Sequence, residues 1–338
     1  MSTREINQPA LIDAFGRQVD YVRLSVTDRC DFRCVYCMSE DMTFAPKPSV
    51  LSLEELFEIA NAFVALGVTK IRLTGGEPLI RNDVLSLVER VGELEGLHQL
   101  ALTTNGSQLQ RLAPSLHSAG VNRLNISLDS LQPRKFRNLT RHGTLDQVVS
   151  GIDAAIASGF QSIRLNAVIL KGRNEDEVLD LVDFAVERGI DIAFIEEMPL
   201  GAISEHDRAL SFCSSAELRG MIAASYELNE LGDPAGNAGP ARYFECSGTR
   251  SRVGFISPHS HNFCHLCNRV RVTAEGRLLL CLGNEHSIDL RAVLRGPNYN
   301  PQALKDAIIG AMTQKPERHH FALDEEPQIV RFMNTTGG

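Results

Sequence analysis

Residues 21–37 read YVRLSVTDRCDFRCVYC, a β-rich run that leads directly into three closely spaced cysteines. Residues 21–26 predict a strand, so Cys30, Cys34 and Cys37 are expected in the loop at its C-terminal end. Three thiolates in so short a loop can hold one four-iron cluster and leave its fourth iron open. Zinc is the alternative, and it would need a fourth ligand from elsewhere in the chain.

Short β-rich runs alternate with helical periodicity over about the first 200 residues. The further strands are expected at 70–74, 100–104, 123–128, 163–169 and 191–196. Helices are expected from Ser52, where Glu55 completes a capping box and Gly67 is a stop, and from near Asn82, Gln108, Thr144 and Asn174. This order predicts an α/β fold, an incomplete (β/α)6 TIM-like barrel, with a doubly wound open sheet as the competing architecture.

The β/α rhythm stops after Met198, which divides the chain into a barrel at 1–210 and a smaller α+β region at 211–338. Helices are expected from Ser215 and over Pro301–Met312. The runs 269–274 and 277–282 are joined by Glu275-Gly276, which predicts a hairpin. That hairpin would bring Cys281 back toward Cys264 and Cys267, a second triad. The tail MNTTGG has too little apolar content to hold itself in a core.

Composition indicates a folded, water-soluble enzyme: of 338 residues, 43% are hydrophobic and 22% charged, with a net charge of -8. That charge argues against a general role on nucleic acid or at a membrane surface. No signal segment and no apolar run of about 20 residues is present, so a cytoplasmic location is expected. Reduced cysteines fit that compartment, and Cys213 and Cys246, outside both triads, are expected as small buried side chains.

Several basic residues lie where a sheet would bury them. Arg23, Lys70, Arg72 and Arg164 fall within predicted strands, and Arg269 and Arg271 follow the second triad. A cation inside a barrel either faces a polar cavity or costs roughly several kcal/mol if unpaired. These residues therefore predict an anion site, against the alternative of ordinary surface charges.

The first triad, with Tyr36 before its last cysteine, and LTGGEP at 73–78 resemble the motifs of radical S-adenosylmethionine (SAM) enzymes. Within that superfamily, CHLCNRVRV at 264–272 followed by Cys281, FIEEMPLG at 194–201 and the terminal Gly-Gly are similar to the GTP 3′,8-cyclases. The likeness covers nearly the whole chain.

The resemblance implies two [4Fe–4S] clusters and the first step of molybdenum-cofactor synthesis. The cluster on Cys30, Cys34 and Cys37 would cleave SAM, and the 5′-deoxyadenosyl radical would take the ribose 3′ hydrogen of GTP. The sugar radical would then attack guanine C8, giving (8S)-3′,8-cyclo-7,8-dihydroguanosine 5′-triphosphate. The cluster on Cys264, Cys267 and Cys281 would bind the guanine.

The resemblance also implies roles for individual residues. SAM contacts would come from Tyr36, Gly76, Ser127 and Met198, although Met198 is also typical of a core and Tyr36 of simple packing. GTP contacts would come from Arg23, Lys70, Arg72, Thr103, Arg164, Arg269, Val270 and Arg271. Catalytic roles would fall to Gly337, Gly338, Arg269 and Arg271, with a frayed end as the alternative for the glycines. Two positions depart from the family pattern: Arg164 replaces Lys, and Ala193 stands where Arg is expected.

The implied partners are a downstream cyclic pyranopterin monophosphate synthase, an electron donor such as flavodoxin or ferredoxin, and a second copy in a homodimer. Two alternatives remain. One is a radical SAM paralogue with an auxiliary cluster that acts on another substrate, a peptide or a nucleotide. The other is a zinc scaffold in which His259, His261 or His265 completes the second site. His319 and His320 are expected at the solvated surface.

Overall fold

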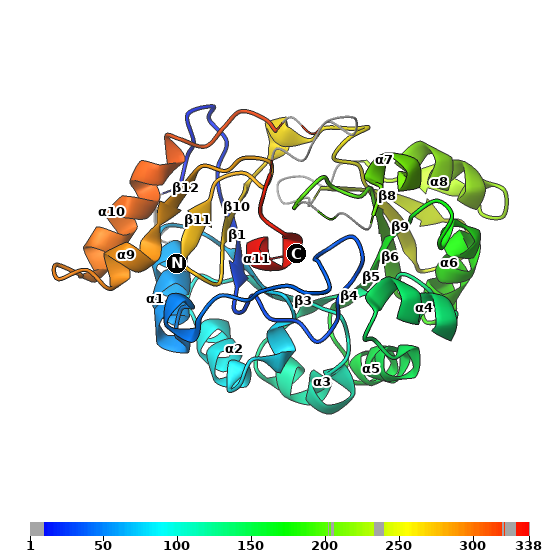
Figure 1. Ribbon diagram of the computed structural model, residues 1–338, viewed down its shortest axis with the longest axis horizontal. Coiled ribbons are helices and arrows are strands. Elements are labelled where there is room, and N and C mark those ends of the chain that lie inside the picture. The colour runs from blue at the N-terminus through cyan, green and yellow to red at the C-terminus, as the bar shows by residue number, and fades with distance from the viewer. Residues whose placement is uncertain are drawn as a thin grey trace, which may run out of the picture.

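A partial barrel of six parallel strands forms the centre of the molecule. The structure is a computed structural model, and it describes residues 10–201, 203, 206–232, 240–319, 321 and 329–337. The barrel strands are β1 (Tyr21–Ser25), β2 (Lys70–Thr74), β3 (Gln99–Thr104), β4 (Arg123–Ser127), β5 (Ser162–Val168) and β6 (Asp191–Ile195). Each pairs in parallel with the next, and the strands curve around a central space (Figure 1). The incomplete barrel is confirmed.

The same sheet continues beyond both edges of the barrel. On one side β9 (Arg252–Ile256) pairs in parallel with β6, followed by β8 (Ala241–Cys246) and β7 (Leu228–Glu230). On the other side β10 (Arg269–Val272) pairs in parallel with β1, followed by β11 (Arg277–Leu279) and β12 (Ser287–Asp289). The C-terminal residues thus extend the barrel sheet at both edges. The domain boundary near residue 210 stays a prediction.

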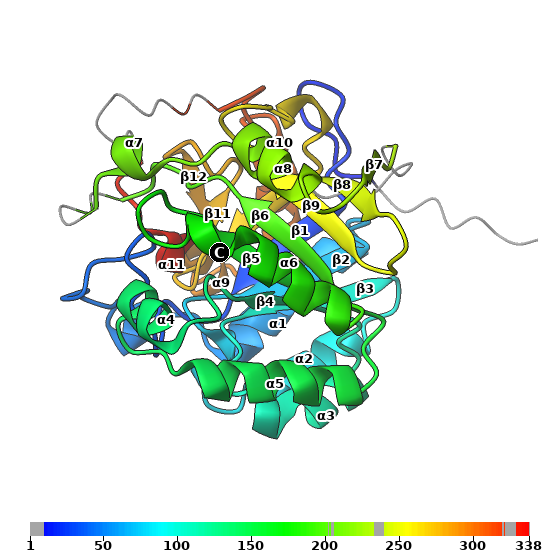
Figure 2. The same ribbon diagram turned by 90° about the vertical axis from the view of Figure 1, so that its right-hand side faces the viewer.

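Helices cover the outer face of the barrel (Figures 1 and 2). They are α1 (Leu53–Ala65), α2 (Val84–Gly92), α3 (Leu109–Ser118), α4 (Pro133–Thr140), α5 (Leu145–Ala157) and α6 (Val178–Glu187). The later helices are α7 (Arg208–Ser211), α8 (Ser215–Ala223), α9 (Leu290–Leu294), α10 (Pro301–Met312) and α11 (Met333–Thr336). Short 3-10 turns occupy Lys47–Ser49, Pro78–Ile80, Glu175–Glu177 and Cys264–Leu266. The predicted capping box forms at Ser52, whereas α4 was not predicted.

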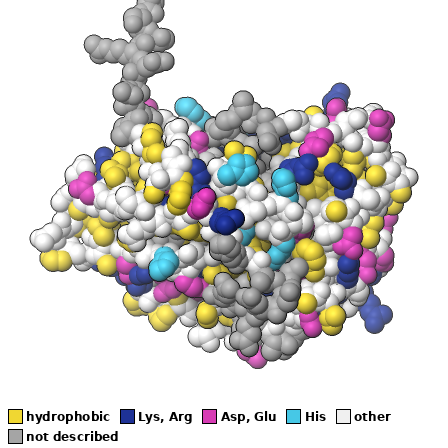
Figure 3. Space-filling model, turned by 90° about the horizontal axis from the view of Figure 1, so that it is seen from above, with side chains coloured by type: hydrophobic (Ala, Val, Ile, Leu, Met, Phe, Trp, Pro, Cys, Tyr) yellow, Lys and Arg dark blue, Asp and Glu magenta, His cyan; other side chains and the backbone are white. Residues whose placement is uncertain are grey.

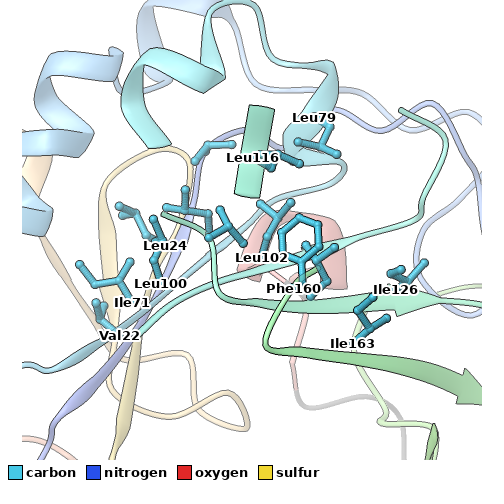
Figure 4. Close-up of a cluster of buried hydrophobic side chains, with 14 of the residues drawn as sticks. Val22, Leu24, Ile71, Leu79, Leu100, Leu102, Leu116, Ile126, Phe160 and Ile163 are labelled. Carbon is cyan, nitrogen blue, oxygen red and sulfur yellow. The ribbon is translucent and has the colours of Figure 1, made fainter. Parts of the chain in front are cut away.

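The hydrophobic core lies between the strands and the outer helices. Alternate strand residues point outward, among them Val22 and Leu24 of β1, Ile71 of β2 and Leu102 of β3, and they pack in one layer with Leu116 of α3 (Figure 4). The residues between them, such as Arg23 and Arg72, line the interior. Because strand side chains alternate with period two, the apolar half of each strand builds the core and the polar half lines a cavity.

Two C-terminal features bear on the cavity. The predicted hairpin forms as β10 and β11, and Gly276 in its turn has a φ of 82°, a conformation that suits glycine. The tail lies in the interior although it has too little apolar content to hold itself in a core: α11 lies at the centre of the strands in Figure 1, and Asn334 and Thr336 are buried. The tail is held by polar contacts, which its low apolar content does not reveal. In the described part of the chain, no helix is long and apolar enough to cross a membrane.

The Ser52 cap offers a test of the local folding of α1. Ser52 Oγ accepts from Glu55 N, and the Glu55 carboxylate accepts from Ser52 N. Replacing Ser52 by Ala should lower the free energy of unfolding by about 1 kcal/mol, measured by chemical denaturation. Ser115→Ala, at an exposed position of α3, is the control and should change it by less than about 0.5 kcal/mol. Equal effects would show that the cap contributes nothing specific.

Candidate active site

One cavity of about 530 Å³ occupies the barrel interior, and it is lined from both halves of the chain. All six triad cysteines line it, as do the residues expected to contact SAM or GTP: Arg23, Tyr36, Lys70, Arg72, Gly76, Thr103, Ser127, Arg164, Met198, Arg269, Val270 and Arg271. Met198 is only partly buried and lines the cavity, so it is not a residue of the hydrophobic core. The fold thus brings together two cysteine motifs that are more than 200 residues apart.

The loop of the first triad is held by α4. Arg33 N donates to Thr140 O (2.9 Å) and Val35 N donates to Leu139 O (3.0 Å). Phe32 meets Phe136 of α4 edge to face. Cys37 N donates to Cys34 O (2.9 Å), which closes the loop on itself. The helix that the sequence did not reveal is therefore the one that positions the cysteines.

The glycines of LTGGEP lie directly against this loop. Gly76 N donates to Thr27 O (2.7 Å) and Glu77 N to Arg29 O (2.8 Å). A Cβ at Gly76 would lie 2.2 Å from Arg29 O, so no other residue fits. The buried Glu77 carboxylate accepts from Thr104 Oγ1, Leu79 N and Asn105 N, yet burial raises its pKa to about 8.

Tyr36 leads to a carboxylate that the sequence did not single out. Tyr36 Oη donates to Asp129 Oδ2 (2.7 Å), and Asp129 Oδ1 accepts from Val168 N (2.9 Å). Asp129 is buried and Tyr36 is half-buried on the cavity wall, and burial raises the pKa of Asp129 to about 6. Asp129 follows β4 directly, as site residues of barrels often do, and that position was the available signal.

The second triad lies in a more basic setting than the first. Burial raises the pKa of Cys37 to about 12 and also raises that of Cys30 and Cys34. Burial would likewise raise the pKa of Cys267, but Arg269 and Lys315 lower it to about 7. The buried Lys315 Nζ lies 3.4 Å from Cys267 Sγ and donates to Leu280 O (2.9 Å). Sequence reasoning missed Lys315, because it is distant in the chain.

His319 corrects one expectation. Its Nδ1 lies 3.0 Å from Cys264 Sγ, so it is not a solvated surface residue. His320 lies outside the described residues. Of the histidines weighed as zinc ligands, His261 and His265 are exposed, and His259 Nε2 contacts Glu197 O. Among the described residues no group of three or more His, Cys, Asp or Glu side chains is arranged around a single metal ion.

The donor set of each triad fits an iron–sulfur cluster. Each supplies three thiols to the cavity, and the other two cysteines, Cys213 and Cys246, are buried elsewhere, as expected. Three thiolates leave one iron of a four-iron cluster without a cysteine. The cavity beside each triad would give such an iron access to a small molecule.

Basic side chains stand in register across three neighbouring strands. Parallel pairing sets Arg23 of β1 beside Arg271 of β10 and Arg72 of β2. In the adjoining row Tyr21 stands between Arg269 and Lys70. No described carboxylate forms an ion pair with these cations, and Arg23 Nε has no hydrogen-bond partner in the described chain. Like charges directly opposite one another disfavour a sheet, so this arrangement calls for an anionic ligand.

The phenol of Tyr21 organises this basic cluster. Arg72 Nε donates to Tyr21 Oη (2.6 Å), and Lys70 Nζ lies 4.7 Å from the centre of the ring. Burial lowers the pKa of Lys70 to about 8 and that of Arg72 to about 10. Although burial alone would raise the pKa of Tyr21, Arg72 and Arg23 hold it well below its usual value. By contrast, the face seen in Figure 3 carries interspersed charges of both signs.

The C-terminal tail reaches the same interior. Gly337 has a φ of 76°, its carbonyl accepts from Arg271 Nη1, and a Cβ there would lie 2.4 Å from Thr74 Oγ1. Asn334 Nδ2 donates to Asp28 O (2.9 Å) beside the first triad. Gly338 lies outside the described residues. The tail therefore contacts β2, β10 and the approach to the cysteine loop.

Comparisons with known proteins agree with this arrangement. The family model of the radical SAM superfamily matches residues 24–185, and that of Molybdenum Cofactor Synthesis C matches 190–321. The chain is 62% identical over 331 residues to the GTP 3′,8-cyclase of Marinobacter nauticus, covering 98% of this chain and 99% of the relative. It is 61% identical over 335 residues to that of Pseudomonas entomophila, covering 99% and 100%.

Solved structures show the same fold at low identity. Streptococcus suis SuiB matches with a TM-score of 0.61 and 15% identity, over 89% of this chain and 68% of that chain. SuiB bound to its precursor peptide SuiA matches with a TM-score of 0.60 and 16% identity, over 90% and 67%. At such identity the likeness concerns the fold alone.

Asp129 gives a pH-dependent prediction. Its folded pKa of about 6 exceeds the ordinary 3.8, so the folded state holds the proton more tightly and stability is lost as pH rises through about 6. Asn in its place does not titrate, and it can accept from Val168 N through Oδ1 and donate to Tyr36 Oη through Nδ2. The free energy of unfolding of the wild type should fall relative to Asp129→Asn by about 1 kcal/mol between pH 5 and pH 7.

The measurement is chemical denaturation of both proteins in the same state of cluster loading. Asp180→Asn, at an exposed position of α6, is the control and should run parallel to the wild type. Parallel pH profiles for Asp129→Asn and the wild type would refute the raised pKa.

Proposed function

The chain belongs to the GTP 3′,8-cyclase family of radical SAM enzymes, and from that premise we infer that it cyclises GTP in the barrel cavity. The reaction moves a hydrogen from ribose C3′ and joins C3′ to guanine C8, giving (8S)-3′,8-cyclo-7,8-dihydroguanosine 5′-triphosphate. This is the first step of molybdenum-cofactor synthesis. The observation that carries the proposal is that both cysteine triads and the unpaired cations line one cavity.

SAM and an iron–sulfur cluster at Cys30, Cys34 and Cys37 are the cofactors of the radical SAM part of the chain. When bound there, they supply the 5′-deoxyadenosyl radical. The exposed backbone at Gly76, which admits no side chain, is suited to the amino-acid end of SAM. Tyr36, Ser127 and Met198 line the adjoining wall. These residues would hold SAM on the wall of the cavity that also receives the substrate.

The triphosphate is assigned to the basic cluster. Arg23, Lys70 and Arg72 face the cavity from β1 and β2, and Arg269 and Arg271 face it from β10. Guanidinium groups bind phosphate oxygens through parallel hydrogen bonds, and a bound triphosphate would relieve the repulsion within each row. Thr103 Oγ1, which accepts from Arg72 Nη1 (3.2 Å), orients one of these guanidiniums. Arg164 faces the same cavity from β5.

A second cluster at Cys264, Cys267 and Cys281 would bind the guanine and fix C8 toward the ribose. Three thiols without a fourth support a cluster with an open iron. Lys315 and Arg269 lower the pKa of Cys267, which favours the thiolate that ligation requires. Val270 lines the cavity between Arg269 and Arg271, but it pairs with Val22 and its side chain packs in the outer core, so its backbone is the part available to the nucleotide.

Further partners are part of the same proposal. The product would pass to a cyclic pyranopterin monophosphate synthase, and an electron donor such as flavodoxin or ferredoxin would reduce the first cluster. A homodimer in the cytoplasm, without nucleic-acid or membrane partners, completes the expected setting.

The proposal is tested by anaerobic turnover of the cluster-loaded protein with SAM, dithionite and GTP. We expect 5′-deoxyadenosine and a cyclised isomer of GTP in equal amounts, identified by mass spectrometry. Replacing Cys264, Cys267 and Cys281 by Ser should halve the bound iron if each triad holds one cluster. SAM cleavage without change in GTP would overturn the assignment of the substrate.

The tail provides a separate prediction. Gly337 contacts Arg271 and Thr74, so removing Gly337 and Gly338 frees the Arg271 guanidinium, which we place against the triphosphate. Cyclised product should fall by about 100-fold, the cost of a misplaced reacting group, with iron content and unfolding midpoint unchanged. Val330→Ala, at an exposed position of the same tail, should keep full activity. Full activity of the truncated protein would show that the two terminal glycines have no catalytic role.

A further inference from the structure

Arg164 is held in the cavity wall by two neutral acceptors. Its Nη1 donates to Tyr243 Oη (2.5 Å) and its Nε to Asn166 Oδ1 (3.1 Å). Within the described chain it forms no ion pair with a carboxylate. A phenol and an amide fix the direction of a guanidinium but leave its charge uncompensated, whereas a carboxylate would neutralise it. Arg164 is therefore both oriented and available to an anion.

The place of the Tyr243 ring depends on two small neighbours. Strand register sets Asn166, Ala193, Gly254 and Tyr243 side by side across β5, β6, β9 and β8. A Cβ at Gly254 would lie 3.0 Å from Tyr243 Cε1 and 3.3 Å from Ala193 Cβ. The ring therefore lies over Gly254, and the Ala193 methyl lies close to the same point on the neighbouring strand β6. A long side chain at either position would displace the ring from Arg164.

Arg252 is a second arginine on this wall, and unlike Arg164 it forms an ion pair with a carboxylate. Its guanidinium lies 5.0 Å from the Tyr243 ring centre, and its Nη2 pairs with Asp191 Oδ2 at 2.5 Å. The Tyr243 side chain thus contacts two arginines on this wall, Arg252 through its ring and Arg164 through its hydroxyl, and Asp191 pairs with Arg252. Asp191 is also the register partner of Arg164, but its ion pair is with Arg252, and no ion pair between Asp191 and Arg164 forms in the described chain.

We propose that Tyr243 is a positioning residue that aims Arg164 at the triphosphate of the nucleotide, in the space that Ala193 and Gly254 leave open. The inference rests on the proposed function, since it takes GTP as the ligand. It accounts for Ala193: this wall binds phosphate through a phenol-held Arg164 and needs no cation on β6. Ala193→Arg would crowd the ring and is not expected to strengthen GTP binding.

The test removes one oxygen. Tyr243→Phe keeps the ring and loses the acceptor of Arg164 Nη1, so the KM for GTP should rise about threefold to tenfold with kcat nearly unchanged. Calorimetric binding of GTP, and separately of inorganic tripolyphosphate, to the cluster-loaded protein without reductant should weaken by the same factor. Tyr226→Phe is the matched control, because the Tyr226 hydroxyl donates to Asp183 at the surface. It should leave the KM for GTP and the affinities for GTP and tripolyphosphate unchanged.

A double-mutant cycle separates positioning from general loosening of the wall. If Tyr243 acts through Arg164, adding Tyr243→Phe to Arg164→Ala should have no further effect on GTP or tripolyphosphate binding. Additive losses, or unchanged binding by Tyr243→Phe alone, would overturn the inference. If the wild-type protein were inactive on GTP, the proposed function would be wrong. Binding of tripolyphosphate to the wild type and to Tyr243→Phe would still decide the role of Tyr243.

Discussion

The structure depends on one constraint: positively charged side chains lie side by side on neighbouring strands of the barrel. Parallel pairing of β10, β1 and β2 places Arg271, Arg23 and Arg72 side by side, facing the barrel interior. Bare cations in such a row repel one another and lose hydration, a cost of roughly several kcal/mol for each uncompensated charge. An interior of this kind cannot close into an apolar core, so the core lies outside the strands and the centre stays open for an anion.

The strands added at the two edges of the barrel sheet contribute binding residues to opposite sides of that cavity. β10 brings half of the basic cluster and, through its hairpin with β11, the second cysteine triad. β9 and β8 bring Gly254 and Tyr243 to the opposite edge of the barrel. The first triad enters from the β1 loop, held by α4. The basic cluster and both triads line one cavity. A single nucleotide can therefore contact the second triad with its base and the cations with its phosphates.

The parts predictable from sequence were those that local pattern determines. The strand positions, the Ser52 cap, the β10–β11 hairpin and the inward-facing positions of Arg23 and Arg72 all follow from alternation, capping and turn chemistry within a few residues. The missed parts depend on contacts between distant segments. His319 reaches Cys264, Tyr243 reaches Arg164, and Asn334 reaches Asp28, and none of these pairs has a local signal. The burial of the polar tail likewise has no local signal, because the tail is held by hydrogen bonds to distant strands and loops.

The position of hydrogen abstraction tests the account most directly, because it depends on SAM, the ribose and the guanine being held in one cavity. The measurement is anaerobic turnover of 3′-deuterated GTP, followed by mass spectrometry of the 5′-deoxyadenosine formed. The account predicts that deuterium appears in 5′-deoxyadenosine as the cyclised nucleotide accumulates. Deuterium-free 5′-deoxyadenosine, formed while GTP is consumed, would contradict it, because the radical would then have taken its hydrogen from another position.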